Sequence, residues 1–113
     1  MRFLAAFDKF KDSLAADEVC SLARQTLHNC LPGAVVRETP LTDGGEGFCE
    51  ILTNACGGRF LNFVVTGPMG DPVEACVGFV AVEKLSPQVR ELEEFPSNGE
   101  LALVEMASAA GLQ

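Results

Sequence analysis

The sequence predicts an α/β fold, in which a parallel β-α-β layer is followed by the start of a second, mixed α/β domain. Up to residue 65, strand-like and helix-like apolar patterns alternate; turn formers then crowd residues 66–72, and a long strand follows without an intervening helix. Strands that alternate with helices favour parallel pairing and right-handed crossovers. We therefore expect one domain over residues 1–65 and the beginning of another over residues 66–113.

The first strand and the first helix are predicted from hydrophobic periodicity. Phe3–Phe7 is a continuous apolar run, of the kind that a strand in a sheet covered on both faces requires. After a polar loop we expect Asp12 or Ser13 to cap a helix whose first turn carries Asp17 and Glu18. The apolar face of this helix recurs every three or four residues, at Val19, Leu22, Ala23, Leu27 and Cys30 or Leu31.

Turn residues then delimit three further elements of the first domain. Pro32-Gly33 ends the first helix, and residues 34–38 form a short second strand. A second helix is expected over residues 48–55, with Gly57-Gly58 as its C-terminal stop. Residues 59–65 complete the strand, helix, strand, helix, strand order, so we expect this third strand to join the parallel layer.

The second half of the chain has a different pattern. Residues 73–82 form a long strand, which we expect to pair in a hairpin or another antiparallel arrangement. Residues 83–99 are acidic, contain proline and glycine, and indicate a solvated loop with a helical turn. A strand over residues 101–105 leads into a helix or turn of small residues at 106–111. Because nothing after this element covers its exposed face, we expect the chain to be the N-terminal portion of a longer protein.

Composition excludes several classes of partner. Sixteen acidic and eight basic residues give a formal charge of −8, and an acidic surface repels the phosphate backbone of nucleic acids. Trp and Tyr are absent, which removes the usual platforms for stacking bases. No apolar run approaches the roughly 20 residues that span a bilayer. We therefore expect neither a nucleic-acid partner nor a membrane-bound protein.

The cysteine pattern indicates reduced, buried thiols in a cytoplasmic protein. A zinc site or redox motif needs more closely spaced ligands, and a disulfide scaffold normally has an even number of cysteines. Here the count is odd, no C-x-x-C occurs, and the positions are Cys20, Cys30, Cys49, Cys56 and Cys76.

The first candidate loop runs from Asp8 to Ser13, between the first strand and the first helix. In open parallel sheets, ligands bind at the carboxyl ends of strands, where helix N-termini supply backbone donors. Lys9 and Lys11 are two of only eight basic residues; a lysine neutralises phosphate, and Ser13 offers a hydroxyl. A solvated loop followed by a capped helix remains an alternative interpretation.

The second candidate loop covers residues 43–47 and contains three glycines. Glycines let a backbone approach a ligand closely and turn its N–H groups toward an anion. Asp43 and Glu46 carry hard oxygen ligands, which Mg²⁺ uses together with substrate phosphates. A plain turn before a helix, with Glu46 favouring the helix dipole, is the alternative. The loop matches neither the Walker A nor the G-x-G-x-x-G pattern, so neither conventional nucleotide motif is present.

Four sequence blocks together resemble the glycerate kinase type I family. They appear in the order and at about the spacing of that family and cover nearly the whole chain. The blocks are Asp8-x-Phe10-Lys11-x-Ser13-Leu14, Pro40-Leu41-x-Asp43-Gly44-Gly45-Glu46-Gly47, Val65-Thr66-Gly67-Pro68-Met69-Gly70, and Glu105-Met106-Ala107 with Gly111-Leu112.

The resemblance implies a transferase that moves the γ-phosphoryl group of ATP to D-glycerate in the cytoplasm, with Mg²⁺. It implies a longer enzyme with a Rossmann-like domain into which a second domain is inserted, and the change of pattern at Thr66 agrees with such a boundary. Its partners would be small molecules, D-glycerate and ATP, with a homodimer left open. The product would be a phosphoglycerate, usually 2-phosphoglycerate in the bacterial branch.

The site residues implied by the resemblance come from both candidate loops. The catalytic residues are Lys11, Asp43 and Glu46, of which Asp43 and Glu46 also bind the metal. The substrate- and phosphate-binding residues are Asp8, Ser13, Gly44, Gly45 and Gly47. A non-catalytic module that binds an anion or a sugar acid, derived from a kinase domain, is the alternative function.

Three positions depart from the family pattern. Asp12 stands where the family usually has Gly, Lys9 where it usually has Ser, and Ala110 where Ser often precedes the closing Gly-Leu. An acidic side chain near a phosphate is unfavourable unless it is paired, so we expect Lys9 to compensate for Asp12.

Overall fold

The structure, a computed structural model, describes residues 1–110 of the 113. Its contacts divide the chain into two compact units, Met1–Asp43 and a second unit that begins at Gly44. The Gly111-Leu112 part of the fourth sequence block lies outside the described residues. The longest described helix has 15 residues, and among residues 1–110 no helix is long and apolar enough to cross a membrane.

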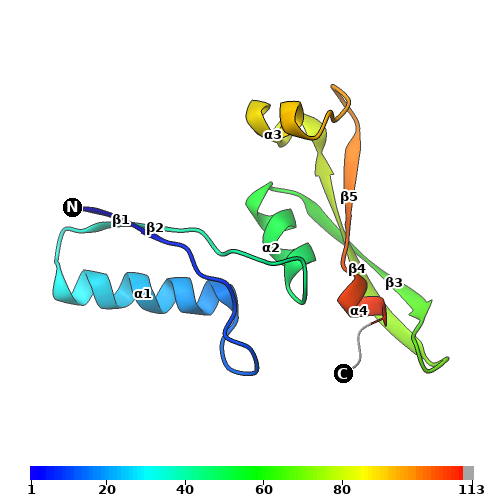
Figure 1. The fold of residues 1–113 in the computed structure, drawn as a ribbon, viewed down its shortest axis with the longest axis horizontal. Coiled ribbons are helices and arrows are strands. Elements are labelled where there is room, and N and C mark those ends of the chain that lie inside the picture. Colours follow the sequence, from blue (N-terminus) through cyan, green and yellow to red (C-terminus); the bar gives the residue numbers. More distant parts are fainter. Residues whose placement is uncertain (111–113) are drawn as a thin grey trace. The chain divides into compact units, whose positions relative to one another are not determined.

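The first unit is a parallel β-α-β motif (Figure 1). Strand β1 (Arg2–Ala5) and strand β2 (Val35–Glu38) pair in parallel, and helix α1 (Ala16–Cys30) connects them and packs against both. This confirms the predicted parallel pairing of the first two strands. Small side chains let the helix approach the strands closely. The buried residues of the unit are Ala5, Ala16, Val19, Cys20 and Ala34.

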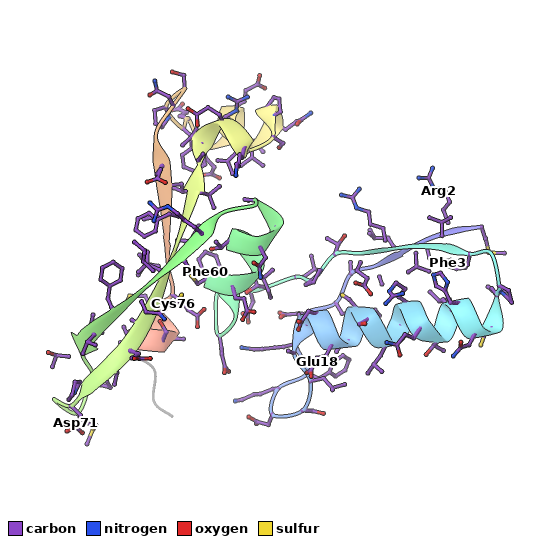
Figure 2. All side chains as sticks on the ribbon, turned by 180° about the vertical axis from the view of Figure 1, so that it is seen from behind. Arg2, Phe3, Glu18, Phe60, Asp71 and Cys76 are labelled. Atoms are coloured by element: carbon purple, nitrogen blue, oxygen red, sulfur yellow. The ribbon has the colours of Figure 1, made fainter. Side chains whose placement is uncertain are left out.

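Only one face of β1 is covered within the described residues. Phe3 lies on the side of α1 and Arg2 on the opposite side (Figure 2). Ala5 is 3% exposed, whereas Leu4 is 64% and Val35 59% exposed. The expectation that this apolar strand is covered on both faces is therefore wrong for residues 1–110. Side chains alternate between the faces of a strand, and only the set facing α1 is buried.

Helix α1 begins later than predicted, so the expectation that Asp12 or Ser13 caps it is wrong. Its N-cap residue is Ala15, whose backbone N–H donates to Oε2 of Glu18 over 2.8 Å. Ser13 lies two residues before this N-cap, and its N–H closes a separate turn by donating to the Phe10 carbonyl. The acidic first turn is confirmed, and Glu18 provides the cap from inside the helix.

The second unit packs two helices, α2 (Phe48–Ala55) and α4 (Met106–Ala110), on a three-stranded antiparallel sheet in the order β3-β4-β5 (Figure 1). The predicted hairpin and the predicted helical turn after it are both confirmed. The elements are α2 (Phe48–Ala55), β3 (Arg59–Thr66), β4 (Pro72–Ala81), a 3₁₀ turn (Val82–Lys84), α3 (Pro87–Leu92), β5 (Glu100–Val104) and α4 (Met106–Ala110).

The expectation that the third strand joins the parallel layer is wrong. Strand β3 pairs antiparallel with β4, from Arg59↔Phe79 to Thr66↔Pro72. A tight turn causes this, since the Gly67 N–H donates to the Asp71 carbonyl over 2.8 Å and reverses the chain. Strands joined by so short a loop must be antiparallel. The predicted domain boundary between residues 65 and 66 stays a prediction.

Helix α2 packs on β4 unusually closely. Thr53 of α2 is fully buried, and a Cβ atom at Gly78 of β4 would overlap its Oγ1 and lie 3.0 Å from its Cβ. A Cβ at Gly58 would overlap the carbonyl oxygen of Phe79. The absence of side chains at both glycines is therefore what lets the helix reach the sheet. The core beside this contact contains Cys49, Val80, Val82, Leu85 and Leu103.

Candidate functional site

The first candidate loop and the start of the second leave the same edge of the β1–β2 pair. The Thr39 N–H donates to the Ala5 carbonyl over 2.8 Å, and the Leu41 N–H donates to the Phe7 carbonyl over 2.9 Å. The parallel strands therefore stay together beyond their regular ends. Asp8 follows this edge on one strand and the second loop follows it on the other. In open α/β sheets the carboxyl edge of parallel strands is where ligands bind.

The first loop folds back on itself. Phe10 and Leu14 exchange both backbone hydrogen bonds, over 2.9 and 3.0 Å, and close a turn that holds residues 11–13. Lys11 and Ser13 are exposed there. Asp8 is half-buried, and its Oδ1 accepts the Lys9 N–H over 2.7 Å. The turn thus leaves the amine of Lys11 and the hydroxyl of Ser13 accessible to a ligand.

Asp12 has a left-handed backbone, with φ of 59°. Glycine adopts this conformation without steric cost, which explains why the resemblance predicts Gly at this position. Asp and Asn are the non-glycine residues that tolerate it best, because their short side chains form local hydrogen bonds. Asp12, in place of the usual Gly, is therefore compatible with the turn, although it adds a negative charge.

The second loop requires glycine at two positions for conformational reasons. Gly44 and Gly47 both have φ of 92°, which side chains of L residues rarely adopt. A Cβ atom at Gly44 would have nothing within 4 Å, so the dihedral angle rather than crowding sets the requirement there. The Phe48 N–H donates to the Gly45 carbonyl over 3.1 Å, and Gly47 is the N-cap residue of α2.

Asp43 and Glu46 are exposed, one at the end of the first unit and one in the second. Among residues 1–110, no group of three or more His, Cys, Asp or Glu side chains is arranged to hold a metal ion. Mg²⁺ in phosphoryl-transfer sites uses one or two carboxylates together with phosphates and water. Each of these two carboxylates carries oxygen donors of this kind, and their joint role in a Mg²⁺ site stays a prediction.

The sequence patterns predicted no role for one buried carboxylate near the second loop. Glu105, directly after β5, is only 8% exposed. Its Oε2 accepts the backbone N–H of Cys49, in the first turn of α2, over 3.1 Å. The sequence signal was an acidic residue immediately after an apolar strand, but its partner lies 56 positions away.

The five cysteines are all free. Cys20 and Cys49 are buried, but Cys30 is exposed, so the prediction of buried thiols is wrong at that position. Desolvation raises the pKa of the half-buried Cys76 thiol, and the neighbouring Cys49 raises it further. Because the thiolate is the reactive form, Cys76 is a poor nucleophile at neutral pH.

A shallow hollow of about 270 Å³ lies beside α3. It contains none of the predicted site residues, so it does not support the candidate site. Its lining residues are Pro87, Arg90, Glu91, Phe95, Pro96 and Ser97.

Known proteins with similar sequences identify the class of this chain. Glycerate kinase from Bacillus subtilis (strain 168) is 37% identical over 112 residues, covering 99% of this chain and 25% of that protein. Glycerate 2-kinase from Escherichia coli (strain K12) is 32% identical over 113 residues, covering 100% of this chain and 26% of that protein. Fold and relatives together define an α/β phosphotransferase family.

Two further matches identify the particular family. A crystal structure described as a candidate glycerate kinase 2 from Salmonella typhimurium LT2 matches with a TM-score of 0.67 and 36% identity, over 96% of this chain and 25% of that one. The profile of the glycerate kinase family matches residues 3–113. This chain belongs to the glycerate kinase family, which confirms the resemblance seen in its sequence blocks. It spans about a quarter of the length of these relatives.

Proposed function

We propose that this protein phosphorylates D-glycerate with ATP and releases 2-phosphoglycerate. The observation that carries the proposal is that the Asp8–Ser13 loop and Asp43 both follow the carboxyl edge of a parallel strand pair, in a chain of the glycerate kinase family. The proposal includes a cytoplasmic location and small-molecule partners. The names of the relatives support glycerate as the acceptor.

Phosphoryl transfer depends mainly on positioning and on neutralising the charge of the transferred group. In this proposal Lys11 neutralises phosphate charge, while Asp43 and Glu46 hold Mg²⁺ or orient the acceptor hydroxyl. Gly44 and Gly45 offer backbone N–H groups to phosphate oxygens. When bound, Mg²⁺ would supply positive charge between the nucleotide phosphates.

The remaining predicted site residues would complete the binding surface. Asp8 stands at the carboxyl edge itself, Ser13 offers a hydroxyl in the closed turn, and Gly47 gives the backbone its left-handed exit into α2. A half-buried carboxylate such as Asp8 suits the recognition of a glycerate hydroxyl group, because it accepts hydrogen bonds when ionised.

The proposal is tested on the native gene product, that is, residues 1–113 with any sequence that accompanies them. We expect ADP release that requires D-glycerate, ATP and Mg²⁺ together. Phosphorus NMR then identifies the product, because a phosphate on the 2-hydroxyl couples to one neighbouring proton and a phosphate on the 3-hydroxyl to two. A doublet is expected. If ADP release does not depend on D-glycerate, the proposed kinase activity is refuted. A triplet would refute only the assignment of 2-phosphoglycerate as the product.

A second prediction concerns residues 1–113 expressed alone. We expect no turnover, because the chain spans only a quarter of its relatives and a kinase site between domains needs both of them. The measurement is ADP release beside the native gene product as the positive control. Turnover near the ~1–100 s⁻¹ of ordinary kinases would contradict this prediction. Binding of D-glycerate without turnover by the native gene product would instead agree with the alternative of a non-catalytic binding module.

A further inference from the structure

Helix α2 begins directly after the glycine-rich loop and lacks a cap from its own N-cap residue. That residue is Gly47, which has no side chain, and no side-chain cap bond forms there. The Phe48 N–H is satisfied by the Gly45 carbonyl. The next N–H, that of Cys49, is satisfied by the Glu105 carboxylate over 3.1 Å. Helix starts need such acceptors, since their first N–H groups have no partner inside the helix.

The Glu105 carboxylate is suited to this contact in two ways. It is only 8% exposed, and a buried carboxylate is costly unless hydrogen bonds compensate it. A negative charge at a helix N-terminus is also stabilised by the helix dipole, and a charge-assisted bond is stronger than a neutral one. The contact thus compensates a buried charge and an unsatisfied donor at once.

Both ends of the contact are held in place by further bonds. The Cys49 thiol donates to the Leu103 carbonyl over 3.3 Å, so this residue is attached to β5 by its side chain as well. The backbone carbonyl of Glu105 accepts the Ser108 hydroxyl over 2.8 Å at the start of α4. The first turn of α2 is therefore bonded both to β5 and to the residue that joins β5 to α4.

We propose that Glu105 is a positioning residue that holds the first turn of α2 and, through it, the glycine-rich loop of residues 44–47. Gly47, whose φ is 92°, joins the loop directly to α2, so a bond that fastens the first turn of α2 also restrains this end of the loop. Glu105 acts through the Cys49 N–H and takes no part in the chemistry. Only the assignment of this loop to ligand binding rests on the proposed function.

The experiment compares three variants of the native gene product. Glu105→Ala removes the acceptor, Glu105→Gln keeps an acceptor oxygen without the charge, and Val80→Ala is a control that destabilises the same core from β4. Hydrogen exchange is followed at the backbone amides of residues 44–49, and steady-state kinetics are measured with D-glycerate.

In Glu105→Ala we expect these amides to exchange about 5–30-fold faster, the range that loss of a helix cap implies. The KM for D-glycerate should rise several-fold, because binding must then order the loop. Glu105→Gln should stay within about threefold of the parent in both measurements, since the amide oxygen still accepts the bond. Val80→Ala should lower Tm but change loop exchange and KM less than Glu105→Ala does, because it leaves the bond between Glu105 and the Cys49 N–H in place.

Two outcomes would overturn the proposal. If Glu105→Ala lowers Tm but changes loop exchange and KM no more than Val80→Ala does, Glu105 is a structural residue only. If Glu105→Gln loses kcat strongly with unchanged exchange, the charge itself acts in catalysis. A parent protein inactive on D-glycerate would refute the proposed function, while the exchange comparison would still decide the role of Glu105.

Discussion

Replacing Asp43 by Asn in the native gene product is expected to lower kcat for D-glycerate phosphorylation by roughly 10²–10³, or about 2.7–4 kcal/mol. Asp43 is exposed in a loop that leaves the carboxyl edge of β1 and β2, and its neighbour Gly44 has open space around it. Asn keeps the size and part of the hydrogen bonding but removes the charge. If the charge binds Mg²⁺ or orients the acceptor hydroxyl, the loss falls mainly on the transition state.

The matched control for this variant is Asp12→Asn. Asp12 is also an exposed acidic loop residue, and Asn tolerates its φ of 59°, so the turn should survive. We expect kcat to change only a few-fold there. Steady-state kinetics of both variants, with circular dichroism as the test of folding, measure the difference. An Asp43→Asn enzyme with kcat within a few-fold of the parent would show that the loop is structural.

Replacing Gly78 by Ala is expected to destabilise the protein by about 1–3 kcal/mol, the usual cost of forcing extra atoms into a packed core. The new Cβ would overlap Oγ1 of Thr53 and lie 3.1 Å from its Cγ2. Gly78 is in the central strand, paired with Phe60 on one side and Leu103 on the other, so the strand cannot easily move away. Helix α2 must therefore shift.

Thermal unfolding of the native gene product measures this effect. At about 2–4 °C per kcal/mol for a protein of 150–250 residues, we expect Tm to fall by roughly 2–12 °C. Ala102→Val adds more atoms to the same sheet at an exposed position and should change stability by less than about 0.5 kcal/mol. Thr53→Ala should relieve part of the Gly78→Ala loss. A Gly78→Ala protein as stable as the parent would mean that α2 packs less closely than described.

Local sequence patterns determined the positions of most helices and strands. The helix over residues 48–55 was predicted with the bounds it has, because an apolar face begins after a glycine-rich loop and Gly57-Gly58 ends it. The long strand and its hairpin were predicted for the same reason, since turn formers and periodicity act over a few neighbouring residues. The sequence blocks likewise indicated the family and both candidate loops.

The tertiary structure decided the partner of β3, the cap of α1 and the contact of Glu105. Strand β3 completes the strand–helix–strand order that predicted parallel pairing, yet the tight turn after it leaves β4 as its nearest partner. Helix α1 starts only at Ala16, after the turn that Phe10 and Leu14 close, so its N-cap is Ala15 and not Asp12 or Ser13. The contact between Glu105 and Cys49 joins residues 56 positions apart, and nothing in their neighbourhoods encodes it. Periodicity describes the face that a segment buries, whereas strand partners and long-range caps depend on the packing of the whole chain.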